Sequence, residues 1–230
     1  MGDWRRHAIY FAPPAGSALA AFGAAWLGWD PATGVATDGL ALQGIDRDAV
    51  TAAPRRYGFH ATLKPPFRLA GTVEALDAAA AAVAAGRQGF ALRLRLAEIG
   101  RFLALVPATP GGEAGAGALA DACVRGLDAF RAPAGAEELA RRRGGGLDAE
   151  EEANLVAWGY PYVGSRFRFH MTLTGALPDG LRAEVAAALA PQLAPLLAEP
   201  VPVVEVCRFA EAADGRFRIV RRFPLGGGPG

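Results

Sequence analysis

Alternating apolar and polar positions mark two stretches of the chain and predict two strands of the same kind. Residues 57–64 and 167–174 both place large apolar side chains at every second position, with polar ones between them. Because successive side chains on a strand point to opposite faces, Phe59, Ala61 and Leu63 are expected to enter a core. The polar residues of each strand should then share the other face.

The periodicity that follows each strand predicts the same order of elements twice. After the first strand we expect a helix at 72–86, a strand at 90–96 and an apolar segment at 101–106. After the second we expect a helix at 180–198, a strand at 201–208 and a hairpin leading into 216–220. This order predicts an α+β fold of two pseudo-symmetric lobes, each an antiparallel sheet with helices packed outside, around a central cleft. The internal repeat spans roughly 57–106 and 167–223 of a single bilobal domain, 1–225.

The middle and the ends of the chain have a different character. A first strand is predicted at 9–11, and helices are predicted at about 113–130 and 148–158. The run Arg141–Arg143 follows two glutamates on a predicted helix, so we interpret it as a solvated charged face rather than a phosphate clamp. The glycine-rich segment 226–230 is expected to be a disordered tail.

The polar faces of the two predicted strands carry the same tetrapeptide, His-x-Thr-Leu. It begins at His60 and again at His170, and places Thr62 and Thr172 two positions later. The two copies use two of the three histidines, a coincidence on the order of one in ten thousand by chance. We expect these four side chains to face one cleft and to be the catalytic residues. His7 has no threonine two positions later and is left out of the site.

Basic and aromatic residues flank both motifs. Together with the threonine hydroxyls, the cationic side chains favour a pocket that binds a phosphate. The candidate substrate-binding residues are Lys64, Arg166, Arg168, Tyr57 and Tyr160. Lys64 is the only lysine of the chain, and it fits a point charge near a phosphate and an ordinary surface lysine equally well. The tyrosines would stack on a base or sugar, but aromatic residues beside proline and glycine are as often loop anchors.

Composition restricts the partners of the protein. The chain has 230 residues, 52% of them hydrophobic, and a net charge of +1, so a broad basic surface for long nucleic acid is disfavoured and a small phosphorylated substrate fits better. Cys123 and Cys207 lie far apart without metal-ligand spacing, which favours reduced thiols, a cytoplasmic location, and neither a metal nor another cofactor. No apolar run reaches membrane-spanning length and Pro13–Pro14 interrupts the N-terminal apolar stretch, so we expect an unprocessed monomer without a membrane partner.

The two motifs resemble the hallmark of the two-histidine phosphoesterases, a pair of His-x-Thr/Ser-hydrophobic motifs on strands of two related lobes. The flanking segments 57–67, 158–162 and 167–175 resemble the branch of that group associated with phosphonate-utilisation operons. The resemblance to the group implies cyclic phosphodiesterase, RNA 3′-end phosphodiesterase or 2′-5′ RNA ligase chemistry. The resemblance to the branch implies a small sugar phosphate or nucleotide from phosphonate breakdown.

The predicted function is a metal-independent phosphodiesterase that hydrolyses a small cyclic phosphate. One histidine would be neutral and take a proton from water, and the other would be protonated and donate to the leaving oxygen. The residues leave open which histidine has which role.

Two alternatives to this predicted function stay open. An RNA end-processing or ligase-type enzyme would need a basic or aromatic track beside the cleft, and a non-catalytic nucleotide- or phosphate-binding protein would tolerate loss of either histidine.

Overall fold

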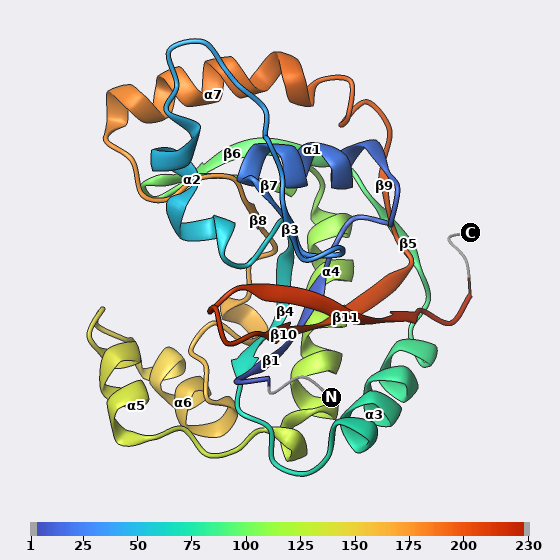
Figure 1. Cartoon of the computed structure of the whole chain (residues 1–230). Coiled ribbons are helices and arrows are strands. Elements are labelled where there is room, and N and C mark those ends of the chain that lie inside the picture. Colours follow the sequence, from blue (N-terminus) through green and yellow to red (C-terminus); the bar gives the residue numbers. More distant parts are fainter. Residues whose placement is uncertain (1–3, 228–230) are drawn as a thin grey trace.

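The computed structural model describes residues 4–227 and is built around one seven-stranded antiparallel sheet, with the strand order β11-β10-β1-β4-β8-β7-β6 (Figure 1). Its strands are β1 (His7–Phe11), β4 (Ala61–Phe67), β6 (Leu94–Ile99), β7 (Phe102–Pro107), β8 (Met171–Thr172), β10 (Glu205–Glu211) and β11 (Phe217–Pro224). Two further antiparallel pairs are β2 (Trp29–Asp30) with β3 (Val35–Ala36), and β5 (Phe90–Leu92) with β9 (Val201–Val203). The predicted α+β class is confirmed.

Five of the seven α-helices of the described chain begin at a residue whose side chain caps the first turn. They are α1 (Ala18–Leu27), α2 (Arg47–Arg55), α3 (Val73–Ala85), α4 (Pro110–Gly126), α5 (Ala136–Arg143), α6 (Ala149–Trp158) and α7 (Asp179–Leu193), with short 3-10 helices η1 (Asp128–Phe130) and η2 (Gly164–Arg166). The side chains of Thr72, Thr109 and Asp148 accept hydrogen bonds from backbone N–H groups of the first turns of α3, α4 and α6. The sequence pattern did not predict α1 and α2.

The main hydrophobic core lies on one face of the sheet. Strand residues such as Ile9, Ala61 and Leu63 pack there against side chains from α1, α3, α4 and α7. The other face carries a smaller apolar cluster of Ala8, Tyr10, Ala12, Cys207, Phe209 and Phe217. Because residues on β1 and β10 alternate between these two clusters, the sheet separates a helix-covered face from a face that is available for a site.

The sheet order is nearly symmetric about its centre. From the middle outwards, β4-β1-β10 on one side corresponds to β8-β7-β6 on the other, and β11 is an additional edge strand. In chain order, β1-α1-β4-α3-β5-β6 corresponds to β7-α4-β8-α7-β9-β10. The predicted copies at 57–106 and 167–223 contain matching elements, but in the chain-order repeat β6 ends the first series and β7 begins the second, although these two strands are neighbours on the same side of the sheet. The two halves are therefore joined in one continuous sheet.

Several elements differ in extent from the prediction. The motif strands are shorter than 57–64 and 167–174 because β4 begins at Ala61 and β8 covers only Met171–Thr172. The predicted strand 90–96 is divided between β5, which pairs with β9, and β6, which pairs with β7. In the predicted tail, the backbone of Gly226 donates to Ala84 and the carbonyl of Gly227 accepts from Gly89, while residues 228–230 lie outside the described part of the chain.

One buried hydrogen bond connects α1 with the second motif and should contribute to stability. The buried indole N–H of Trp26 donates to the carbonyl of Leu173 at 2.8 Å. Replacing Trp26 by Phe would leave that carbonyl unpaired, so we expect the free energy of unfolding in urea to fall by about 1–3 kcal/mol. Trp158→Phe is the matched control and should change it by less than about 0.5 kcal/mol. Equal losses in both variants would contradict a specific role for the buried hydrogen bond.

Candidate active site

The centre of the site is the single residue pair through which β4 and β8 are joined. Ala61 lies opposite Met171 in this antiparallel pairing, and both side chains are buried in the main core. The register therefore places His60 opposite Thr172 and Thr62 opposite His170 on the other face of the sheet. In such an arrangement the two histidines occupy a diagonal whose backbone positions are about 7–8 Å apart.

Both imidazoles are held by the backbone in the same way. Nδ1 of His60 lies 2.8 Å from the carbonyl of Gly58, and Nδ1 of His170 lies 2.8 Å from the carbonyl of Arg168. A carbonyl can only accept, so each Nδ1 carries the proton, and each Nε2 is the atom left to exchange a proton with a substrate. Gly58 has φ +75°, and a side chain there would collide with Pro31, so glycine is required where this carbonyl turns toward His60.

The two histidines have different surroundings. The ring of His60 stacks on Tyr10 at 3.9 Å between centroids and also lies near Tyr57 and Phe209. Burial lowers the pKa of His60 to about 4; the hydrogen bond with Gly58 opposes this change and the charge of His170 adds to it. Within residues 4–227, the only aromatic ring in contact with His170 is that of Phe102, at 5.8 Å between the ring centroids.

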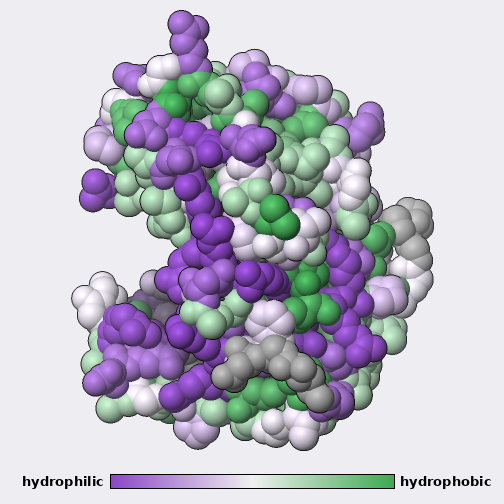
Figure 2. Space-filling view, viewed as in Figure 1, coloured by the Kyte–Doolittle hydropathy of each residue, from purple (hydrophilic) through white to green (hydrophobic). Residues whose placement is uncertain are grey.

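Two adjoining cavities flank the four motif residues. The larger, of about 440 Å³, is lined by Thr62 and His170, and the smaller, of about 300 Å³, by His60 and Thr172; Phe102 lines both. Figure 2 shows the molecule hollowed between the part that carries α7 and the part that carries α5 and α6, with hydrophilic residues along the hollow. The four motif residues thus line two cavities that share Phe102, with His170 at the larger and His60 at the smaller.

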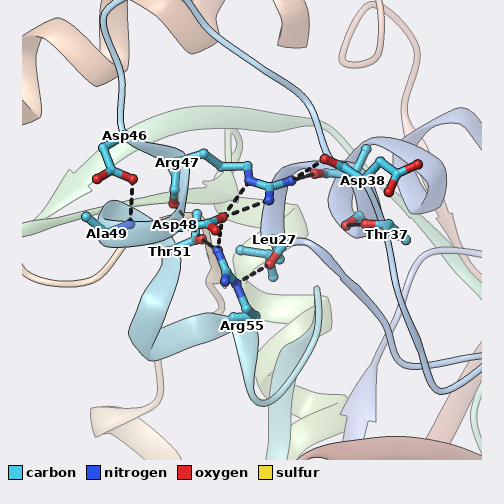
Figure 3. Close-up of polar contacts among 11 residues, drawn as sticks. Leu27, Thr37, Asp38, Asp46, Arg47, Asp48, Ala49, Thr51 and Arg55 are labelled. Carbon is cyan, nitrogen blue, oxygen red and sulfur yellow. Dashed lines mark hydrogen bonds and ion pairs between the residues drawn. The ribbon is translucent and has the colours of Figure 1, made fainter.

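Helix α2 forms one wall of the smaller cavity and is fixed by a network of arginines (Figure 3). Arg47 donates to the carbonyls of Ala25 and Asp38 and to the carboxylate of Asp48. Arg55 donates to the same carboxylate and to the carbonyl of Leu27 at the end of α1. These contacts connect α1, the loop that follows it, and α2, so that the wall does not depend on hydrophobic packing alone.

Lys64 does not join the cleft, in contrast to the expected polar face. A β-bulge in the pairing of β1 with β4 sets Thr62 opposite Tyr10 but Lys64 opposite Ile9, which belongs to the main core. The irregularity reverses the alternation, so Lys64 turns to the helix-covered face. There its Nζ is 3.1 Å from the carbonyl of Val124 and 3.3 Å from Asp128, with burial lowering its pKa.

The two predicted arginines differ in their availability. Both line the larger cavity. Arg166 is paired with Asp148 and with Glu150 at the start of α6, so its charge is already balanced and it fixes the segment before the second motif against that helix. Arg168 is exposed and has neither an ion pair nor a side-chain hydrogen bond within residues 4–227. Arg168 is therefore the cation that a bound anion can use.

All four tyrosines of the chain lie around the cleft. Tyr160 lines the larger cavity and makes an edge contact with Tyr162, while Tyr57 lines the smaller cavity and stacks on Phe217. Tyr10, which sequence reasoning missed, lies beneath His60. A strand pattern at 9–11 was visible, but nothing in the sequence showed that this strand would pair with the first motif.

The arginine run and the third histidine, which we did not assign to the site from the sequence, make contacts that stabilise the fold. In the run Arg141–Arg143, Arg142 pairs with Glu138 and lies over the ring of Tyr160, and Arg143 pairs with Glu152. His7 is buried on the helix-covered face beside Arg208, which is paired with Asp77. Over residues 4–227, no set of three or more His, Cys, Asp or Glu side chains is arranged to hold a metal ion, and no helix has the length and apolarity of a membrane span.

Comparison with known proteins identifies the family. A family model described as a protein of unknown function (DUF1045) matches residues 62–218, well over half of the chain. The chain belongs to the DUF1045 family. Two curated proteins that match it are both named ribose 1,5-bisphosphate phosphokinase PhnN. The protein of Janthinobacterium sp. (strain Marseille) is 44% identical over 178 residues, and that of Laribacter hongkongensis (strain HLHK9) is 38% identical over 179 residues.

The match covers 75% and 76% of this chain but only 39% and 41% of these two relatives, so this DUF1045 chain spans about two fifths of their length. Among solved structures, a phosphoesterase is 15% identical with a TM-score of 0.41, and E. coli LigT complexed with 3′-AMP is 16% identical with a TM-score of 0.42. Both alignments cover 97% of this chain and 99% of the other. TM-scores below 0.5 establish neither a shared fold nor a shared activity.

The buried state of His60 predicts how stability depends on pH. Its folded-state pKa of about 4 lies below the value near 6.5 of an unfolded histidine, so the unfolded chain binds more protons between these pH values. Stability should therefore fall as the pH decreases through this range. We expect wild type to lose roughly 1–2 kcal/mol more than His60→Gln between pH 7 and pH 5, measured by urea unfolding. Parallel pH dependences would contradict a neutral, buried His60.

Proposed function

We propose that this protein is a metal-independent phosphodiesterase that opens a small cyclic phosphate by acid–base catalysis between His60 and His170. The observation that carries the proposal is the cross-strand arrangement of two histidines and two threonines around the Ala61–Met171 pair. Both imidazoles keep Nδ1 bound to a backbone carbonyl, which leaves Nε2 as the atom that can exchange a proton with a substrate; Nε2 of His60 also lies 3.4 Å from the hydroxyl of Thr62.

The proposed reaction needs three contributions from these residues. The neutral histidine removes a proton from the attacking water, and the protonated histidine donates one to the departing sugar oxygen. Each transfer is worth about 10²–10⁴-fold in rate. Thr62 and Thr172 donate hydrogen bonds to the non-bridging oxygens, where negative charge increases in the transition state. The hydroxyl of Thr62 lies 3.4 Å from Nε2 of His60, so a phosphate held by one is within reach of the other.

For the substrate we propose a cyclic phosphate on a phosphorylated ribose. The curated relatives are named for ribose 1,5-bisphosphate, and this chain matches about two fifths of each. Opening a cyclic phosphate leaves a phosphomonoester on the sugar, the kind of compound that a sugar-phosphate kinase uses. The resemblance of the motif flanks to the phosphonate-operon branch favours the same setting. Arg168, which lies two residues before His170 and has no ion pair within the described part of the chain, supports a second phosphate at the cleft.

The first test concerns the histidines. With excess chelator present, we expect hydrolysis of the cyclic phosphate to continue with a bell-shaped pH profile. His60→Ala and His170→Ala should each lower kcat/KM by about 10²–10⁴-fold, and the double variant should be little worse than either because both act in one step. Loss of activity with chelator and recovery with a divalent ion would refute the metal-independent mechanism, and binding without any turnover would favour a non-catalytic role.

The second test concerns Arg168. Arg168→Gln should lower kcat/KM about 10–100-fold for a ribose cyclic phosphate that carries a further phosphomonoester, and should affect a nucleoside 2′,3′-cyclic phosphate far less. The matched control is Arg95→Gln, which removes an exposed arginine on β6 away from the cavity lining. A uniform loss with both substrates would show that Arg168 does not recognise the additional phosphate. Preference of wild type for an RNA 3′ end would instead favour the RNA-processing alternative.

A further inference from the structure

The near-symmetry of the sheet is broken at one position that lies directly beside the site. On β1, Phe11 is opposite Ala61 and Tyr10 is opposite Thr62; on β7, Leu105 is opposite Met171 and Ala104 is opposite Thr172. Tyr10 and Ala104 are thus equivalent positions in the two halves. One half places an aromatic ring there, and the other places a methyl group.

This difference determines the surface on which each imidazole rests. Tyr10 is 1% exposed, and its ring stacks on His60 with an interplanar angle of 21°. Tyr10 is itself fixed from below by Phe209 at 4.9 Å and by Phe217 at 6.3 Å. His60 therefore has a rigid aromatic floor that excludes water from one face of its ring. Ala104 cannot provide such a floor on the side of His170.

We propose that Tyr10 is a positioning residue that makes the two histidines unequal, holding His60 in the neutral form as the proton acceptor and leaving His170 as the proton donor. The proposal rests on the proposed phosphodiesterase function and assigns a direction to its proton transfers. A stacked ring disfavours the charged imidazolium mainly by removing water from it. The backbone hydrogen bond from Nδ1–H to Gly58 keeps the lone pair of Nε2 directed to the cleft.

In the proposed hydrolysis, each bond that forms is matched by one that breaks. The oxygen of water forms a bond to phosphorus while Nε2 of His60 takes one of its protons. The bond from phosphorus to one ring oxygen breaks, and that oxygen receives the proton carried by Nε2 of His170. The product has one phosphomonoester and one free hydroxyl. Exchange with solvent then removes the proton from Nε2 of His60 and replaces the proton lost by Nε2 of His170. The step needs no oxidant or reductant.

The titratable groups around His60 come from several elements. Tyr10 faces it from β1, Tyr57 from the segment before β4, and His170 from the segment before β8. Behind Tyr10, Glu211 of β10 is paired with Arg6 and Arg56. A carboxylate already held by two guanidinium groups does not provide His60 with a partner that would favour its protonation. The ring of Tyr10 is then the main contact that the variants below change.

The test is the titration of the His60 imidazole by NMR in the substrate-free protein, with wild type, Tyr10→Phe and Tyr10→Met compared. Tyr10→Phe retains the stacked ring and should leave the midpoint of His60 within a few tenths of a pH unit. Tyr10→Met fills a similar volume without a flat ring and should raise the midpoint by about 1 unit. Phe102→Leu, which removes the ring beside His170, is the matched control and should not move the midpoint of His60.

Kinetics then test the assignment of the acceptor. The acidic limb of the kcat/KM profile should move upward in Tyr10→Met by the same amount as the His60 midpoint, and should stay in place in Tyr10→Phe. An unchanged His60 midpoint in Tyr10→Met, or a shift of a full unit in Tyr10→Phe, would overturn the role of the ring. If Tyr10→Met does not fold, Tyr10→Leu takes its place, with the same expected rise of the His60 midpoint. The titration needs no substrate, so its outcome is independent of whether the proposed hydrolysis is correct.

Discussion

The site depends on the antiparallel pairing of two strands at one residue pair, Ala61 with Met171. This pairing joins the two halves of the sheet and directs two buried side chains into the core, so the histidine and threonine on either side of each must face the cleft. A shift of either strand by one residue in this register would turn the histidine and the threonine of that strand inward. Core packing and the geometry of the candidate site are therefore one constraint, which the hydrophobic contacts of Ala61 and Met171 enforce.

Two identical motifs produce two unequal imidazoles because their neighbours belong to different strands. The backbone treats them alike, with the same 2.8 Å contact from Nδ1 to a carbonyl two residues earlier. The difference comes from β1 and β7, which place an aromatic ring beside His60 and a small side chain at the equivalent position near His170. Acid–base catalysis requires one group that accepts a proton and one that donates, so a fully symmetric pair would be less suited to it.

The sequence predicted the α+β class, five of the seven described α-helices and the grouping of the four motif residues, because these follow from periodicity and from side-chain alternation. It failed at Lys64, since a single β-bulge reverses the alternation after Thr62 and sends the lysine to the opposite face. It also treated Arg166 and Arg168 as equivalent. Only the fold shows that Arg166 is neutralised by Asp148 and Glu150, which lie at the start of α6.

The sequence by itself determined which chemistry is available: two histidines, each with a threonine on the same strand face, in a chain of nearly zero net charge. Local spacing was sufficient for this because the side-chain period of a strand is fixed by the backbone. The tertiary structure decided which arginine of the cavity lining has no ion pair within residues 4–227, which tyrosine supports His60, and how strongly His60 is desolvated. These properties depend on contacts between residues distant in the chain, above all the pairing of β1 with β4, and such pairing is selected by the packing of the whole sheet.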